Sequence, residues 1–319
     1  MNGLLFVVHG LTLGLVWFLA VNAAATLIVV AVAGPATRQD RVRPPAFWLG
    51  LRLLPAAASI GFVAAVFLPS YWRYEPRGLV EEFDLTLAAL AIVGFLVLAT
   101  AAARGVTASR RVSRRVRAWL RLARPVTLGD SSMPAFEIDA DVPILTLVGV
   151  LRPRLLLTRG VLKALSDEEL RVSVAHEISH QRAWDNLKRL AMRATPDLMT
   201  ATSAARTIER RWALASEQVA DRQASSSDRA RCALASALVK IARLRPPATP
   251  IAEPISTLVD GGEIASRVER LLDDAPAAAA PRASWQWPAL ALGSTAAALA
   301  YGPLLRGVHV LTELIVNSF

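Results

Sequence analysis

Long uncharged stretches are the feature that most limits how this chain can fold. Residues 1–37 contain no Asp, Glu, Lys or Arg, and within them Leu4–Ala33 is long and apolar enough for a membrane-spanning helix. Phe47–Ser70, Leu85–Ala103 and Trp285–Leu305 are further stretches of this kind, the last with tryptophans at its start. The hydrophobic share of 54% exceeds the roughly 45–50% of soluble proteins. We therefore predict an integral membrane protein with four transmembrane helices.

The basic residues predict how these helices are oriented. The stretch from Arg104 to Arg124, directly after the third expected span, contains eight arginines and no acid, whereas the connection before that span is mainly acidic. Basic residues collect beside spans on the cytoplasmic side. We therefore expect both termini outside a bacterial plasma membrane and residues 105–282 in the cytoplasm. Arg52, near one end of the second span, is expected to extend its charge to the membrane surface.

An arginine-rich run can also bind nucleic acid, but this one needs no such partner. Its position beside a span is explained by topology and by contact with anionic lipid. The expected partners are thus the lipid bilayer and a protein, with no direct nucleic-acid binding. Three units follow: a three-span membrane region (1–104), a cytoplasmic domain (105–282), and a fourth transmembrane helix with a short tail (283–319).

The cytoplasmic domain should be mainly helical with a small sheet. Short β-like runs cover Ala135–Asp139, Ile144–Val150 and Arg154–Thr158. The expected helices run from Ser166 through His180, from Asn186 to about Ala224 with a break near Thr195-Pro196, from Asp228 to Leu244, and from Glu263 to Asp273. The fold class is therefore a mainly α membrane protein with an inserted α+β domain. Cys232, the only cysteine, lies in an Ala-rich helical stretch and is expected to be a small core residue.

A pentapeptide in this domain carries the strongest chemical signal. His176-Glu177-Ile178-Ser179-His180 follows a helix start signal in which Ser166 is the N-cap and Glu169 completes a capping box. Side chains four residues apart share a helix face, so both imidazoles can bind one metal ion while Glu177 reaches a water molecule from the side. This arrangement suits a peptidase with one zinc ion, in which the glutamate takes a proton from that water. The alternative is a pair of ordinary helix histidines.

A catalytic zinc ion also needs a third protein ligand. No other histidine lies in the domain, so we expect a carboxylate, and Glu217 is our choice. Asp221 lies four residues further on, where it can hydrogen-bond a ligand histidine. Glu209 and Asp228 are weaker ligand candidates, and a solvated acidic helix face is the alternative. Asp185 is expected to be a hydrogen-bonding residue at the end of the helix.

The remaining histidines, His9 and His309, lie in or beside spans. We expect each to be an isolated packed or interfacial residue. The domain offers no further histidine or tyrosine to stabilise an oxyanion, and an arginine such as Arg222 or Arg267 is our hypothesis for that role.

The segments HEISHQRAWDN and SEQVADRQA resemble those of the BlaR/MecR-type membrane metallopeptidases, and more loosely those of the HtpX and CAAX-prenyl endopeptidase group. The resemblance implies zinc binding by His176, His180 and Glu217, catalysis by Glu177, and support from Asp221. It also matches Asp185-Asn186 to a pair that follows the active helix. Three spans before the domain and one after it are similar to BlaR/MecR, whereas HtpX places two on each side.

The β-lactam sensors of the first family continue into an extracellular penicillin-binding domain. Here only Arg306–Phe319 follow the last expected span, so we do not expect direct antibiotic sensing. The leading hypothesis is an endopeptidase that cuts a cytoplasmic or membrane-proximal protein, for which the resemblance suggests a BlaI/MecI-like transcriptional repressor. A peptide substrate would pair with an edge strand at Ile144–Val150. The alternatives are quality-control proteolysis of membrane proteins and a non-catalytic signalling scaffold.

Overall fold

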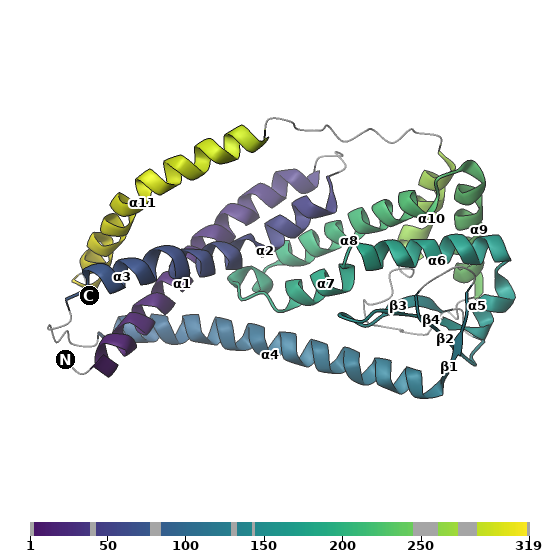
Figure 1. The fold of residues 1–319 in the computed structure, drawn as a ribbon, viewed down its shortest axis with the longest axis horizontal. Coiled ribbons are helices and arrows are strands. Elements are labelled where there is room, and N and C mark those ends of the chain that lie inside the picture. Colours follow the sequence, from purple (N-terminus) through teal and green to yellow (C-terminus); the bar gives the residue numbers. More distant parts are fainter. Residues whose placement is uncertain are drawn as a thin grey trace.

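The computed structural model describes most of the chain. The described ranges are residues 3–38, 43–76, 84–128, 133–141, 144–244, 261–273 and 286–317, without the side chains of residues 37–38, 261–263 and 286–299. The molecule is elongated, with long helices at one end and the small sheet with its covering helices at the other (Figure 1). The expected linkers at residues 245–254 and 275–281 lie outside the described ranges.

Three long apolar helical segments form the first part of the chain. They are α1 (Gly3–Arg38), the continuous segment α2 (Pro45–Phe62), η1 (Val63–Phe67) and α3 (Leu68–Tyr74), and α4 (Leu85–Leu122). Within the described residues, three segments are long and apolar enough to cross a membrane. They expose large apolar side chains such as Leu27, Ile60 and Phe95, as expected for surfaces that face lipid.

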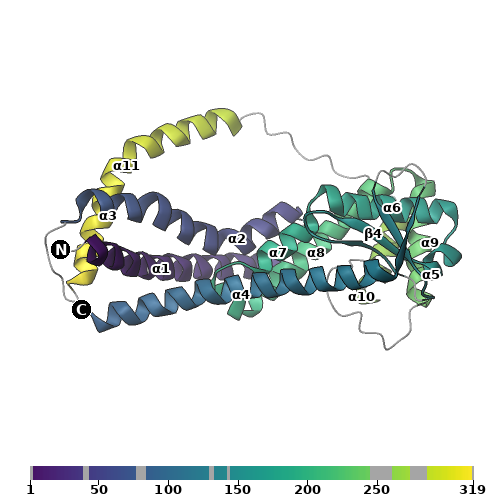
Figure 2. The ribbon, with the colours of Figure 1, turned by 60° about the horizontal axis from the view of Figure 1, so that its bottom comes forward.

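The fourth expected span coincides with the first part of helix α11 (Gln286–Val316). Trp285 and the side chains of residues 286–299 lie outside the described part, so this span is untested. Helix α11 continues past the expected end of the span without a break in its backbone. Its C-terminal end lies beside α3, at the end of the molecule opposite the sheet (Figure 2).

Helix α4 is much longer than a membrane span. Its 38 residues extend over about 57 Å, whereas the hydrocarbon core is about 30 Å thick. The arginine-rich run therefore continues the third apolar helix as one rod, which reaches the sheet. Asp84 caps the N-terminus of α4 through its side chain.

The sheet has four strands in the order β1-β2-β4-β3. The strands are β1 (Ala123–Val126), β2 (Ala135–Ile138), β3 (Leu145–Val148) and β4 (Arg154–Thr158). Strands β1 and β2 are antiparallel, β2 and β4 are parallel, and β3 and β4 are antiparallel. The small sheet predicted from the sequence is confirmed, and β1, which follows directly on α4, is an additional strand. Strand β3 lies at one edge.

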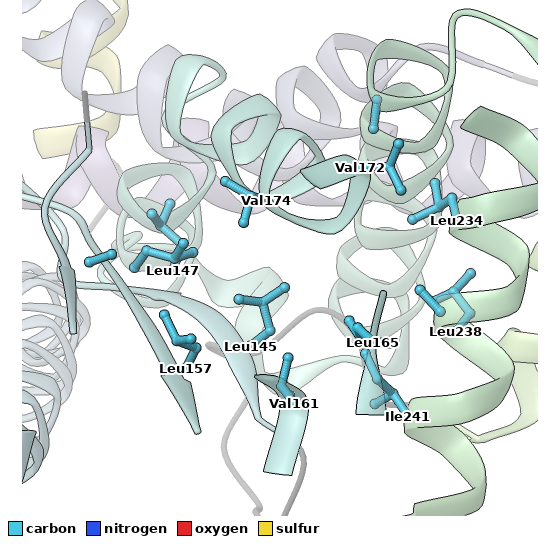
Figure 3. Packing of buried hydrophobic residues seen from close by; sticks show 14 of the residues in the cluster. Leu145, Leu147, Leu157, Val161, Leu165, Val172, Val174, Leu234, Leu238 and Ile241 are labelled. Carbon is cyan, nitrogen blue, oxygen red and sulfur yellow. The ribbon is translucent and has the colours of Figure 1, made fainter. Parts of the chain in front are cut away.

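Six helices, α5 to α10, follow the sheet strands in the chain and form the rest of this part of the described structure. Their bounds are α5 (Arg159–Ala164), α6 (Asp167–Arg182), α7 (Asp185–Arg193), α8 (Ser203–Ala224), α9 (Asp228–Leu244) and α10 (Gly261–Leu272), with a short 3-10 helix η2 (Leu198–Ala201) before α8. The predicted break near Thr195-Pro196 is confirmed. The main core lies between the sheet and helices α6 and α9, where Leu145, Val174 and Leu238 meet (Figure 3).

Helix α6 begins with the predicted capping box. The Ser166 side chain accepts a hydrogen bond from the Glu169 N–H, and the Glu169 carboxylate accepts one from the Ser166 N–H. These two bonds satisfy amides that the first helical turn would otherwise leave unpaired. The capping box fixes the residue at which α6 begins. It therefore also sets the direction in which side chains further along this helix point.

Polar contacts attach the apolar helices to α8 and to the segment that links α7 to α8. Arg52 of α2 is 1% exposed and donates hydrogen bonds to Asp197 at 2.5 Å and to Glu209 at 2.7 Å. Asn22 of α1 donates to the Pro196 carbonyl and accepts from the Leu198 N–H. The expectation that Arg52 extends to the membrane surface is therefore wrong, because two carboxylates hold its charge inside the protein.

Candidate active site

Two helices bring the predicted site residues together. Helix α6 carries His176, Glu177 and His180, and helix α8 carries Glu217 and Asp221. All five side chains are buried. The histidines lie one helical turn apart, and the two helices pack against each other, so a carboxylate from α8 faces both imidazoles.

The facing atoms have the spacing of ligands around a single ion. His176 Nε2 and His180 Nε2 are 3.2 Å apart. Glu217 Oε2 lies 3.4 Å from His176 Nε2, and Glu217 Oε1 lies 3.4 Å from His180 Nε2. Two ligand atoms on one tetrahedral zinc ion are separated by about 3.3 Å, because each bond is about 2.0–2.1 Å long. The residues present thus fit a zinc ion.

Unsatisfied polar atoms support this fit. Neither carboxylate oxygen of Glu217 forms a hydrogen bond, although Arg267 Nη1 lies 3.0 Å from Oε2. Buried polar atoms are normally hydrogen-bonded, so a buried carboxylate whose oxygens form no hydrogen bond has the property of a metal ligand. The donor set of two imidazoles and one carboxylate is one that zinc accepts in catalytic sites.

Two aspartates contact the outer nitrogens of the imidazoles. Asp185 Oδ2 lies 2.7 Å from His180 Nδ1, and Asp221 Oδ1 lies 3.1 Å from His176 Nδ1, although this second pair lacks hydrogen-bond geometry. Burial alone would lower the pKa of His176, but Asp221 and Glu217 raise it to about 9. Contacts of this kind orient the Nε2 atoms toward the centre of the site.

Glu177 lies between the site and the edge strand. Its Oε2 accepts a hydrogen bond from the Leu147 N–H at 2.8 Å, while its Oε1 is buried without a hydrogen-bond partner. Burial raises the pKa of the Glu177 carboxyl group, and the imidazoles of His180 and His176 oppose part of that rise. A carboxyl group with a raised pKa, held beside a candidate metal site, has the properties of a general base.

Arg267 does not have the position expected of an oxyanion donor. Its guanidinium is buried and donates to both Asp221 oxygens, at 3.0 Å and 2.5 Å, besides its contact with Glu217. It therefore fixes the two acidic residues of α8. The other candidate, Arg222, is exposed to solvent. This pairing could not be predicted from the sequence, because Arg267 lies on α10, far along the chain from Glu217.

Arg189 is a cation near the site that was not predicted from the sequence. It lies on α7, where its guanidinium stacks over the Trp212 ring at 5.3 Å and is influenced by the charges of Glu217, Asp185 and Glu177. Burial lowers the pKa of Arg189, and these carboxylates oppose that change. The position of Arg189, four residues after Asp185 on the same helix face, is the only sequence signal for it.

A cavity of about 420 Å³ opens beside His180. Its lining includes Leu147, Val150, Leu151 and Trp184, so it is largely apolar. Trp184 has a positive φ of 58°, an uncommon backbone conformation for a bulky residue. This turn ends α6 and lets α7 begin at Asp185, which places that aspartate beside His180.

The edge strand β3 is already bonded along part of its free edge. Besides the Leu147 N–H bond to Glu177, Asn186 Nδ2 donates to the carbonyl oxygens of Leu147 and Gly149. Strand β3 has the edge position that pairing with a peptide requires, but a substrate would have to pair beside Leu147 or displace Asn186. Peptide pairing at this edge stays a prediction.

The other residues singled out in the sequence lie away from this cluster. Glu209 pairs with Arg52, and Asp228 is an exposed residue that pairs with Arg231. The expectation that Cys232 is a core residue is wrong, because its side chain is exposed. Helix α9 turns its apolar face to the core through Leu234 and Leu238 instead.

A comparison with known protein families gives a match over the part of the chain that carries both helices of the site. A family model described as peptidase family M48 matches residues 147–257. The match supports an M48-like zinc metallopeptidase domain. It spans both helices of the site and does not distinguish the BlaR/MecR type. No curated protein matches the chain. With its three apolar helices, the chain has the features of a membrane-associated metallopeptidase.

Proposed function

We propose that this protein is an integral membrane zinc endopeptidase whose active site lies on the cytoplasmic side. The observation that carries the proposal is the group of three ligand atoms from His176, His180 and Glu217, spaced 3.2–3.4 Å apart next to Glu177. A pair of packed histidines would not require a buried acidic group whose oxygens form no hydrogen bond. The M48 family match over the same helices supports the proposal.

In this proposal His176, His180 and Glu217 hold the zinc ion. When bound, the ion supplies a Lewis acid that acidifies water and polarises the scissile carbonyl group. Glu177 takes a proton from the attacking water and passes it to the leaving amine. Asp185 and Asp221 hold the imidazoles in place, and Arg267 fixes Glu217. Arg189 is the cation we propose to balance negative charge at the site during the reaction.

The substrate we propose is a cytoplasmic or membrane-proximal protein, cut within an extended segment. The apolar lining of the cavity beside His180 favours an apolar substrate side chain next to the scissile bond. The resemblance to BlaR/MecR-type peptidases suggests a BlaI/MecI-like repressor and hence a role in signalling. Turnover of membrane proteins is the alternative for the same chemistry.

The experiment that tests the proposal replaces Glu177 with Gln. The amide keeps the size of the side chain but cannot act as a base, so we expect zinc to stay bound while cleavage falls by about 10²–10⁴-fold. The measurements are the zinc content of the purified full-length protein and a comparison of the proteins cut in cells that carry the wild type or Glu177→Gln.

Glu168→Gln is the matched control on the same helix, because Glu168 pairs with Arg171 and Arg229 away from the site. It should retain wild-type cleavage. Unchanged signalling in Glu177→Gln would instead identify a non-catalytic scaffold, and unchanged cleavage would contradict the role of Glu177 as the base. Removal of zinc with a chelator should have the same effect as Glu177→Gln and should be reversed by added zinc.

A further inference from the structure

A second group of metal-binding side chains lies at the far end of the molecule. Glu75, His309 and Glu313 each offer one ligand atom, and these atoms all lie within 4.8 Å of one another. Glu75 immediately follows helix α3, and the other two belong to α11. Figures 1 and 2 both show this end of α11 beside α3, away from the sheet and the candidate active site.

His309 and Glu313 have the same spacing along a helix as His176 and His180 in the candidate active site. The two residues are four apart on one helix, so their side chains lie on the same face. A third side chain, Glu75, comes from another element. The Glu75 carboxylate is 8% exposed, and the His309 side chain is 23% exposed. All three residues are of intermediate burial, so the group is partly shielded from solvent, unlike a cluster of surface acids.

Other contacts hold these elements in register. Ser70 of α3 donates a hydrogen bond to the Leu305 carbonyl at 2.7 Å, and Trp17 of α1 donates to the Thr312 hydroxyl at 3.1 Å. The Tyr74 ring stacks on the His309 ring at 5.7 Å. The side chains of the group thus project from positions that their neighbours have already fixed, as a binding site requires.

The contact between His309 and Glu75 is a long ion pair. His309 Nδ1 lies 3.8 Å from Glu75 Oε2, which is too long for a hydrogen bond. It is only slightly longer than the separation of about 3.3 Å between two atoms bound to one zinc ion. Two carboxylates near one imidazole also repel each other, and a divalent cation between them would remove that repulsion.

We propose that Glu75, His309 and Glu313 form a second metal site, which binds a divalent transition-metal ion on the membrane side opposite the peptidase domain. One imidazole nitrogen and two carboxylate oxygens suit Zn²⁺ and its neighbours better than Mg²⁺ or Ca²⁺, which prefer oxygen alone. The ion would join α3 to α11 just beyond the π-helical turn η1, a type of irregularity that is frequent at functional sites.

Counting bound ions tests this proposal independently of peptidase activity. Tag-free full-length protein in detergent is dialysed against Zn²⁺, and the bound zinc is measured by mass spectrometry. We expect about two ions per chain in the wild type and about one in a His176→Ala, His180→Ala variant. Adding His309→Ala or Glu313→Gln to that variant should remove the remaining ion.

Asp273→Asn serves as the matched loss of a carboxylate, because Asp273 is exposed and outside both groups. It should leave the count unchanged. A second readout is the rise in melting temperature on Zn²⁺ addition in the His176→Ala, His180→Ala background, which Glu75→Gln and Glu313→Gln should each abolish. No zinc bound in that background, or binding that survives these changes, would overturn the proposal.

Discussion

At the scale of single residues, the candidate active site balances its charges through a few close contacts. Glu217 and Asp221 are buried acids, and both contact Arg267 and His176. Their shared partners hold the pKa of Asp221 near 2 although burial alone would raise it. A metal ion added to this cluster would take over part of the positive charge that Arg267 now provides.

We therefore expect Arg267→Met to destabilise the metal-free protein more than the zinc-loaded one. Removing one partner of a buried ion pair leaves the other charge uncompensated and costs about 3–5 kcal/mol. Zinc would compensate the negative charge of Glu217. Adding zinc should therefore restore part of the stability that Arg267→Met removes. The measurement is the melting temperature in detergent with a chelator and with zinc.

Arg270→Met is the control for this experiment, because Arg270 is exposed on the same helix. It should lower the melting temperature little under either condition. An equal loss for Arg267→Met with and without zinc would show that Arg267 stabilises the fold and not the charge balance of the site.

At the scale of elements, helix α6 is held in position by its first turn. Besides the capping box, the Glu169 carboxylate accepts hydrogen bonds from Lys240 Nζ at 2.7 Å and from Ser236 Oγ at 2.6 Å, both on α9. Burial alone would raise the pKa of Glu169, but these donors lower it to about 2 from an ordinary value of 4.5. The same side chain thus starts α6 and joins it to α9.

This lowered pKa predicts a stability that depends on pH. A carboxylate with a depressed folded-state pKa stabilises the protein fully above its unfolded value. The contribution of Glu169, on the order of 1–3 kcal/mol, should therefore be present above pH 4.5 and disappear as pH falls toward 2. We expect the difference in melting temperature between wild type and Glu169→Gln to be constant from pH 7 to 5 and smaller at pH 3. A difference that grows at low pH would contradict this account.

The segment between α7 and α8 joins the apolar helices to the candidate active site. Arg52 binds Asp197 in this segment, and Arg104 of α4 donates to the Arg193 and Thr195 carbonyls. Because α7 carries Asp185 and α8 carries Glu217, a change in the apolar helices would reach the site through these contacts.

We expect Arg52→Met to loosen this segment. The Asp197 side chain is fully buried, so losing its partner should cost about 3–5 kcal/mol. Hydrogen exchange should become faster at residues 194–202, with little change in the sheet. Arg110→Met, at an exposed position of α4, should leave exchange unaltered, and unaltered exchange in Arg52→Met itself would refute the coupling.

At the scale of the whole molecule, the orientation in the membrane can be tested with the chain's only cysteine. Cys232 is exposed on α9. If the peptidase domain is cytoplasmic, a membrane-impermeant maleimide should label Cys232 only after the cells are permeabilised. Asn317→Cys in a Cys232→Ser background is the counterpart near the C-terminus, and it should be labelled in intact cells. The reverse pattern would invert the proposed topology.

Much of the architecture follows from short-range patterns. The apolar runs predict the three long helices, and the capping box predicts where α6 begins, so the one-turn spacing of His176 and His180 places both imidazoles on one face. The β-like runs predict three of the four strands. Strand β1 is missed because the arginine-rich run before it shows no alternation, and its pairing with β2 depends on where α4 ends.

The sequence by itself determined the local features: which segments are apolar enough to enter a membrane, where helices begin, and which side chains share a helix face. Only the tertiary structure decided which distant groups meet. It brought Arg267 to Glu217, Arg52 to Asp197, and Glu75 to His309, whereas Glu217 had been predicted beside the imidazoles. The physical reason is that helix periodicity acts over a few residues, whereas these charges meet because the packing of whole helices buries them together.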